Sequence, residues 1–179
     1  MGSGGVGKST LCVRYTQGIF VEKYDPTIED AKRKCYEIDG QQYFIEILDT
    51  GTQQFTAMRD LYIKNGEGFI LVYSIIAHST FVDISEIHSN IMGVRNEQGS
   101  AYTPIILAAN KVDLNDQRVI SKESGEELAN QLGCDFMETS AKTPTNVKEL
   151  FENYARMIIQ NKGPKIQLTK KNGGGCQII

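Results

Sequence analysis

The chain has 179 residues, of which 40% are hydrophobic and 23% are charged, and its formal net charge is −3. This composition is typical of one globular domain and excludes a disordered, collagen-like or multi-span membrane protein. Residues 162–179 carry four lysines and no acidic residue, whereas residues 1–161 carry 15 basic and 22 acidic residues. The acidic body argues against nucleic acid as the main partner, and the basic end favours an anionic lipid surface.

A glycine-rich stretch at residues 2–9 opens the chain and matches the pattern G-x-x-x-x-G-K-[ST]. Glycines let the backbone curl so that successive N–H groups face a triphosphate. Lys8 would bring its charge to the β and γ phosphates, and Ser9 would offer a hydroxyl to Mg²⁺. A helix from Ser9 onward would add the positive end of its dipole. The alternative is a flexible glycine-rich terminus. The predicted phosphate-binding residues are Gly2, Ser3, Gly4, Gly5, Val6, Gly7, Lys8, Ser9 and Thr10.

A buried strand normally precedes such a loop, yet only Met1 stands before Gly2. We therefore expect an apolar strand of about six residues upstream in the native protein, and a gap or exposed edge within the sheet of the present chain. Losing four or five large apolar side chains would cost on the order of 10 kcal/mol of burial. The present chain is thus expected to be marginally stable or unfolded.

Apolar runs suitable for strands alternate with segments of helical period, at residues 43–48, 69–74, 105–109 and 136–139. This alternation predicts an α/β fold. Asp39 and Gly40, between runs 32–38 and 41–48, indicate a hairpin. One antiparallel edge strand should therefore lie on an otherwise parallel sheet.

The clearest helix follows Asn146, which is expected to be its N-cap with Glu149 three residues later. Its apolar stripe comprises Val147, Leu150, Phe151, Tyr154 and Ile158. Apolar periodicity ends at Gly163 and Pro164. These features predict a folded domain at 1–161 and a flexible basic tail at 162–179. Four scattered cysteines support neither a disulfide framework nor a zinc site, so we expect free thiols.

Two polar motifs follow consecutive predicted strands. Asn110, Lys111 and Asp113 follow the run 105–109, at the edge where open α/β sheets bind ligands. The Asp113 carboxylate can accept hydrogen bonds from the ring N–H and the exocyclic amine of guanine, whereas adenine offers neither donor in that geometry. An ordinary polar turn is the alternative. The next motif can present backbone N–H groups to the guanine carbonyl, and it comprises Thr139, Ser140, Ala141 and Lys142.

These motifs together resemble those of a Ras-superfamily small GTPase, and within it the Rap branch of the Ras family. Residues 18–30 (GIFVEKYDPTIED) and 55–62 (FTAMRDLY) are similar to the two switch segments of that family. The resemblance implies a P-loop NTPase three-layer sandwich that lacks its central first strand here. It also implies that Phe20 packs against guanine, that Tyr24 covers the phosphates, and that Thr27 and Ser9 bind Mg²⁺ of bound GTP or GDP.

Two departures from the family pattern follow. Asp49, Thr50 and Gly51 contain one residue fewer than the family's Asp-x-x-Gly. Asp49 should still hold a Mg²⁺ water. Gly51 is expected to contact the γ-phosphate, but it lies one residue, about 3.5 Å of extended chain, closer to Asp49 than the family pattern requires. Either Thr52, which the Rap resemblance favours, or Gln53 then orients the attacking water. Ala31 and Lys32 replace the family's Ser-Tyr, so effector identity cannot be transferred from Rap.

The chain ends in Cys176-Gln177-Ile178-Ile179, a C-a-a-X pattern of the geranylgeranyl type. One lipid anchors weakly, so the lysines of the tail would supply the second signal. The sequence thus predicts a lipid-anchored switch at the cytoplasmic face of a membrane that hydrolyses GTP slowly. Implied partners are an exchange factor, a GTPase-activating protein, and effector domains that bind near Glu22 to Arg33. The alternative is a prenylated interaction module with impaired switching, or a truncated, non-functional fragment.

Overall fold

The computed structural model describes residues 1–21, 29–38, 40–50, 56–99, 102–161 and 175–178. Helices and strands alternate along the chain, which confirms the α/β fold. The elements are α1 (Lys8–Gln17), β1 (Glu29–Ile38), β2 (Gln41–Thr50), α2 (Thr56–Asn65), β3 (Phe69–Ser74), α3 (His78–Glu97), β4 (Ile105–Asn110), the 3₁₀ helix η1 (Val112–Gln117), α4 (Lys122–Leu132), β5 (Asp135–Thr139), α5 (Val147–Asn161) and β6 (Gly175–Ile178).

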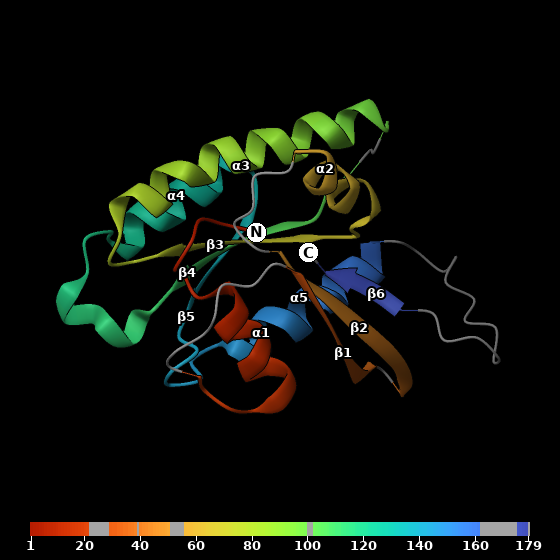
Figure 1. Cartoon of the computed structure of the whole chain (residues 1–179), viewed down its shortest axis with the longest axis horizontal. Helices are drawn as coiled ribbons and strands as arrows, with labels where there is room; N and C mark the ends of the chain where they lie inside the picture. Colours follow the sequence, from red (N-terminus) through yellow and green to blue (C-terminus); the bar gives the residue numbers. More distant parts are fainter. Residues whose placement is uncertain (22–28, 39, 51–55, 100–101, 162–174, 179) are drawn as a thin grey trace.

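Strands β3, β4 and β5 form a parallel sheet in that order. Figure 1 shows α3 and α4 covering one face of this sheet, while α1 and α5 lie on the other. Side chains of β3 alternate between the two faces, as the period of two in a strand requires. Ile70 and Val72 pack with α1 and α5, whereas Phe69, Leu71 and Tyr73 pack with α2, α3 and α4. The sheet is therefore buried on both faces and places the ends of its strands at one edge.

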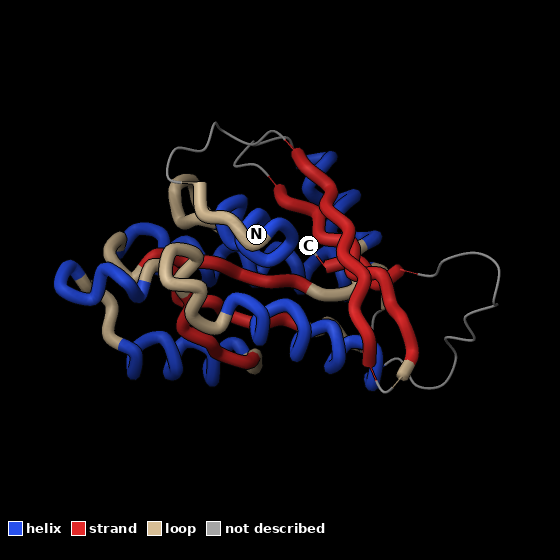
Figure 2. Tube along the Cα trace, turned by 90° about the horizontal axis from the view of Figure 1, so that it is seen from below, coloured by secondary structure: helices blue, strands red, loops and turns tan. Residues whose placement is uncertain are grey.

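The predicted hairpin is confirmed. Strands β1 and β2 pair antiparallel from Glu29 opposite Thr50 to Ile38 opposite Gln41, and Gly40 in the turn has a φ of 77°. Figure 2 shows this hairpin as a long ribbon beside the body of the molecule. Because β1 lies at the edge of its sheet, the expected antiparallel edge strand is also present.

The sheet is not continuous between β2 and β3. The described strands form two three-stranded sheets, in the orders β1-β2-β6 and β3-β4-β5, so that β2 and β3 do not pair. This division is the gap that we expected next to the glycine-rich loop. Between the sheets lies about 350 Å³ of empty volume, partly open to solvent, with Met1, Lys8, Ile47, Asp49 and Val72 among its lining residues.

The edges of β2 and β3 that face each other are each paired with a short segment of backbone. Strand β6 pairs parallel with β2, from Gly175 opposite Phe44 to Ile178 opposite Ile47. The sequence pattern does not predict this pairing for the end of the tail. On the other side, the Met1 amine donates to the Ile70 carbonyl, and the Val72 N–H donates to the Met1 carbonyl at 2.8 Å. The two sheets are held together by packing, because β2 and β3 share one apolar cluster with α1 and α5.

Helix α5 begins directly after Asn146, as predicted, and buries the predicted stripe, from Val147 to Ile158. Asn146 precedes it with a φ of 53°, and its Nδ2 donates to the Glu138 carbonyl at 2.8 Å. In the described part of the chain, no helix is long and apolar enough to cross a membrane. Cys12, Cys35 and Cys134 are free thiols, as expected.

The Met1 amine should make the stability of this chain depend on pH. Burial, followed by the charge of Lys8, lowers its pKa from 8.0 to about 5. Between pH 8 and pH 5 the unfolded amine holds a proton that the folded amine does not hold. We expect the free energy of unfolding to fall by up to about 1.4 kcal/mol for each pH unit in this range as the pH is lowered.

The measurement is urea denaturation at pH 8, 7 and 6, with chain acetylated only at its N-terminal amine as the control. The acetylated chain should show a smaller slope of stability against pH, because the titrating group is gone. Equal slopes for the two proteins would contradict this assignment.

Candidate functional site

The glycine-rich loop curls at residues 2–7 before entering α1. Gly5 and Gly7 have φ values of 72° and 96°, a region that other residues rarely adopt. The Lys8 ammonium turns back over the loop and donates to the carbonyls of Gly2 at 2.7 Å and Ser3 at 2.8 Å. Successive backbone N–H groups of a curled loop that leads into a helix N-terminus are suited to bind an anion.

Lys8 and Asp49 meet at the inner end of the loop, beside the cavity between the sheets. Burial lowers the pKa of Lys8, and the nearby Asp49 carboxylate partly offsets this effect. Asp49 lies near the carboxyl end of β2 and is 2% exposed. The site therefore places one basic and one acidic side chain where the loop meets α1.

The side chain of Asn110 joins the loop to the parallel sheet. Its Nδ2 donates to the Val6 carbonyl at 2.8 Å, and its Oδ1 accepts from the Thr139 hydroxyl at 3.2 Å. Asn110 is 2% exposed at the end of β4. A Cβ atom on Gly7 would lie 2.5 Å from the same Nδ2. The loop can approach β4 this closely only because residue 7 is a glycine.

The second polar motif lies next to Asp113. The Ser140 hydroxyl donates to Oδ1 of Asp113 at 2.6 Å. The same hydroxyl oxygen accepts from the backbone N–H groups of Lys142 at 3.2 Å and Thr143 at 3.1 Å. Ala141, between them, is 4% exposed. Ser140 thus fixes both the carboxylate and the turn that follows β5, so that the two polar motifs of the sequence form one cluster.

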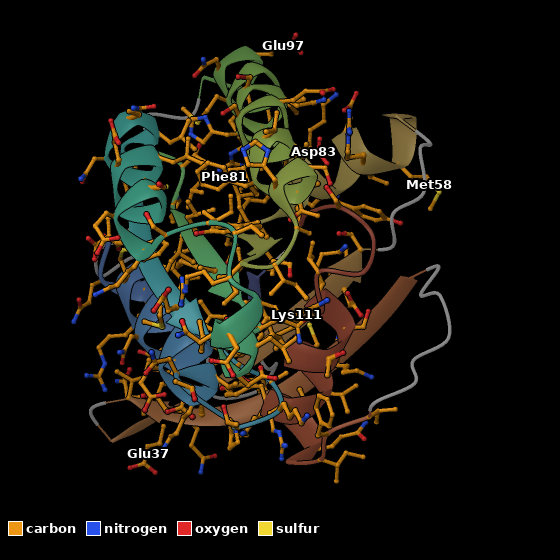
Figure 3. All side chains as sticks on the ribbon, turned by 90° about the vertical axis from the view of Figure 1, so that its left-hand side faces the viewer. Glu37, Met58, Phe81, Asp83, Glu97 and Lys111 are labelled. Carbon is orange, nitrogen blue, oxygen red and sulfur yellow. The ribbon has the colours of Figure 1, made fainter. Side chains whose placement is uncertain are left out.

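Sequence reasoning missed two side chains, one beside this cluster and one beside the glycine-rich loop. Arg14, in the last turn of α1, donates to the carbonyls of Ala141 and Lys142. Asp83, near the start of α3, accepts from the Ser3 hydroxyl at 2.5 Å; Figure 3 labels it close to the ribbon of the N-terminal loop. A basic residue near a helix C-terminus was the only available signal for Arg14. The partners of both residues lie too far along the chain for a pattern to reveal.

The other predicted residues are placed as follows. Ser9 and Thr10 lie in the first turn of α1 and are half-buried, and Lys111, also half-buried, has a φ of 71°. Phe20 is 37% exposed after the C-terminus of α1. Tyr24, Thr27, Gly51, Thr52 and Gln53 lie outside the described residues. Their expected contacts with magnesium, phosphate and water stay predictions.

The arrangement fits a phosphate-bearing ligand with a magnesium ion. The loop approaches β3 so closely that a Cβ on Gly2 would lie 2.2 Å from the Val72 carbonyl, which leaves room only for bare backbone. No group of three or more His, Cys, Asp or Glu side chains forms a metal site among the described residues. Magnesium does not require such a cage, because it is commonly bound by one or two protein groups together with phosphate oxygens and waters. The Ser9 hydroxyl and the Asp49 carboxylate offer groups of this kind.

Among models of known protein families, the one described as Ras family matches residues 1–160 of this chain, which is most of its length. The match covers the curled loop, Asp49, and both polar motifs at the ends of β4 and β5.

Replacing Gly7 by alanine should disrupt the contact between the loop and Asn110. Gly5→Ala is a matched control, because Gly5 also has a positive φ but has open space around its Cα. Gly5→Ala should cost about 1 to 2 kcal/mol of backbone strain. Gly7→Ala should cost at least about 1 kcal/mol more, since the Asn110 to Val6 hydrogen bond is lost as well. Urea denaturation of both variants measures the difference, and equal losses would contradict the assigned role of Gly7.

Proposed function

Because the chain belongs to the Ras family, we propose that it is a switch that binds GTP or GDP with Mg²⁺ and engages effectors in its GTP state. Membership of the family supports a small GTPase in general. The observation that carries the finer proposal is the single cluster formed by the curled loop, Asn110, Asp113 and Ser140. Phosphate-binding and base-reading groups lie together at the carboxyl ends of the strands, where open α/β sheets bind nucleotides.

Residues 2–9 are proposed to hold the phosphates. Backbone N–H groups of the loop and the dipole of α1 attract the negative charge, and Lys8 adds a full positive charge. In the structure, the Lys8 ammonium donates to the Gly2 and Ser3 carbonyls. The same ammonium can turn from these carbonyls to phosphate oxygens, which are stronger acceptors. Ser9, Thr27 and, through a water, Asp49 are the proposed ligands of Mg²⁺, which neutralises charge on the phosphates.

Guanine selectivity is assigned to Asp113, with Asn110, Lys111, Ser140, Ala141 and Lys142 around it. One oxygen of Asp113 is fixed by Ser140, which orients the carboxylate to accept from the base. Ala141 and Lys142 are proposed to donate backbone N–H groups to the guanine carbonyl, while Phe20 packs on the ring. A base lacking the matching donors would leave a buried acceptor unsatisfied.

Hydrolysis is proposed to be slow, at or below the roughly 10⁻⁴ per second of unassisted Ras-type enzymes, and to need a GTPase-activating partner. Either Thr52 or Gln53 is the proposed water-orienting residue, and Lys8 the group that stabilises charge on the phosphates. An exchange factor would promote nucleotide release. Residues 22–33 are the proposed effector surface; Ala31 and Arg33 in the edge strand β1 are exposed. The Rap-like character of the two switch segments is part of the same proposal.

The tail is proposed to anchor the protein at the cytoplasmic face of a membrane. A prenyl group on Cys176 would insert into the bilayer, and the four tail lysines would each add roughly 1 kcal/mol at an anionic leaflet. Since Cys176 lies in β6, which pairs with β2, the tail must leave this pairing before its end can enter a membrane.

Asp113→Asn tests the assignment of the base-reading residue. Asparagine keeps an oxygen for the Ser140 hydroxyl but places an amide N–H₂ where a carboxylate oxygen faced the base. The variant should bind GDP about 100-fold or more weakly and should prefer xanthosine diphosphate, whose extra carbonyl accepts from the new amide. Asp116→Asn, at an exposed position of the same 3₁₀ helix, is the control and should bind as wild type. Competition binding with the two diphosphates measures both variants, and an unchanged preference in Asp113→Asn would sink the assignment.

Cys176→Ser tests the membrane anchor. The variant should move from the membrane fraction of cells to the supernatant, with its affinity for GDP unchanged, because the lipid acceptor is gone and the nucleotide site is intact. Cys35→Ser removes an exposed thiol of β1 and serves as the control. A Cys176→Ser protein that still sediments with membranes would show that the lipid is not the anchor.

A further inference from the structure

The guanidinium of Arg14 links two separate segments on the outer side of the proposed base site. Nε donates to the Ala141 carbonyl at 2.7 Å, and one terminal nitrogen donates to the Lys142 carbonyl at 3.0 Å. The other terminal nitrogen donates to the Gly18 carbonyl at 2.8 Å. A single planar group therefore holds the turn after β5 against the chain that leaves α1.

Phe20 lies on the same guanidinium. The central carbon of Arg14 is 5.9 Å from the centre of the Phe20 ring, within the range of a cation–π contact. Gly18 is also held from the backbone, because its N–H donates to the Arg14 carbonyl at 3.0 Å. Arg14 thus fixes the start of the 18–20 segment and contacts the aromatic ring at its end.

The turn at residues 140–143 is held from two sides. Inside, the Ser140 hydroxyl accepts from the N–H groups of Lys142 and Thr143. Outside, the Arg14 guanidinium donates to the carbonyls of Ala141 and Lys142. Because a peptide carbonyl and the N–H that follows it belong to one rigid plane, fixing the carbonyls also fixes the direction of the neighbouring N–H groups. The N–H groups fixed in this way are those of Lys142 and Thr143, and the Lys142 N–H is one of the two donors that the proposed function assigns to the guanine carbonyl.

We propose that Arg14 is a positioning residue for guanine: it orders the 141–142 turn and the ring of Phe20 so that both face the base before the nucleotide binds. The proposal rests on the proposed function. Without Arg14 the turn must be ordered at the cost of binding energy, which weakens the complex without removing any contact to the ligand. Such a loss appears mainly in the dissociation rate.

The test compares GDP with the diphosphate of 2-aminopurine riboside, which lacks the carbonyl oxygen of guanine and its ring N–H but keeps the exocyclic amine. Each nucleotide is compared between wild type and variant, so the weaker contact with Asp113 is common to both proteins. Arg14→Ala should raise the dissociation rate of GDP about 10- to 100-fold, since hydrogen bonds of a charged group are lost. It should change the dissociation of the 2-aminopurine nucleotide much less, because that ligand does not use the N–H groups that Arg14 orients. Equal changes for the two nucleotides would overturn the proposal and leave Arg14 a merely structural residue.

Two further variants complete the design. Arg95→Ala removes an arginine from the last turn of α3, where it donates to the Lys64 carbonyl at 3.4 Å, remote from the strand ends that form the site. It should leave the dissociation of both nucleotides unchanged, and an effect equal to that of Arg14→Ala would count against the proposal. Arg14→Lys keeps the charge but offers one nitrogen in place of the fork, so it should give an intermediate rate for GDP. If Arg14→Ala does not fold, the dissociation rates of the two nucleotides are compared in Arg14→Lys instead.

Failure of the proposed function has a different signature. Wild-type protein that binds no guanine nucleotide would overturn that function as a whole, and the role of Arg14 in base binding with it. Amide hydrogen exchange at Lys142 and Thr143 would then show whether Arg14 orders the turn: faster exchange in Arg14→Ala than in Arg95→Ala supports this ordering, and equal exchange overturns it.

Discussion

The side-chain amide of Asn110 is the contact on which the geometry of the site depends. It donates to the Val6 carbonyl and accepts from the Thr139 hydroxyl, so it joins the curled loop, β4 and β5 at one point. Since Asn110 is buried, leaving its amide unpaired would be costly, and this cost keeps the three segments together. Gly7 allows the close approach, and the N-terminus of α1 follows directly. The orientation of Lys8, and the position of Asp113 relative to the loop, follow from this arrangement.

The second constraint is the division of the sheet. Strands β2 and β3 do not pair, yet their side chains share an apolar cluster with α1 and α5. Hydrophobic packing is not directional, so it can hold two sheets in place without a continuous hydrogen-bonded ladder. At the facing edges no hydrogen bonds join β2 to β3; instead Met1 pairs with β3, and β6 pairs with β2. The pairing of β6 with β2 connects this part of the molecule to the proposed membrane anchor.

Much of the fold could be predicted from local patterns. The strand β3 has the predicted boundaries, with Gly68 directly before its first residue and the polar Ser74 as its last. The β1–β2 hairpin follows from Asp39 and Gly40. Helix α5 was found from its apolar stripe. In the site, the G-x-x-x-x-G-K-[ST] pattern indicated the loop. Asn110 and Asp113 were indicated by their position directly after a predicted strand. These features depend on residues close together in the sequence.

The rest depends on contacts between residues far apart in the chain. Arg14 and Ala141 are separated by 127 positions, and no periodicity in α1 indicates which carbonyls the guanidinium binds. The pairing of β6 with β2 is equally hidden, because residues 175–178 combine glycine, cysteine and glutamine rather than a strand-like alternation. The tight contact of Gly7 with Asn110 shows why the motif needs glycine there, a reason that the motif itself does not contain.

The central claim is that the cluster around Asn110 and Asp113 binds a guanine nucleotide. The most direct measurement is to purify the protein in the presence of Mg²⁺, denature it, and identify the released nucleotide by chromatography. The account predicts GDP or GTP in about equimolar amount with the folded protein. Adenine nucleotide, or folded protein that releases no nucleotide and takes up none from added GDP, would contradict it.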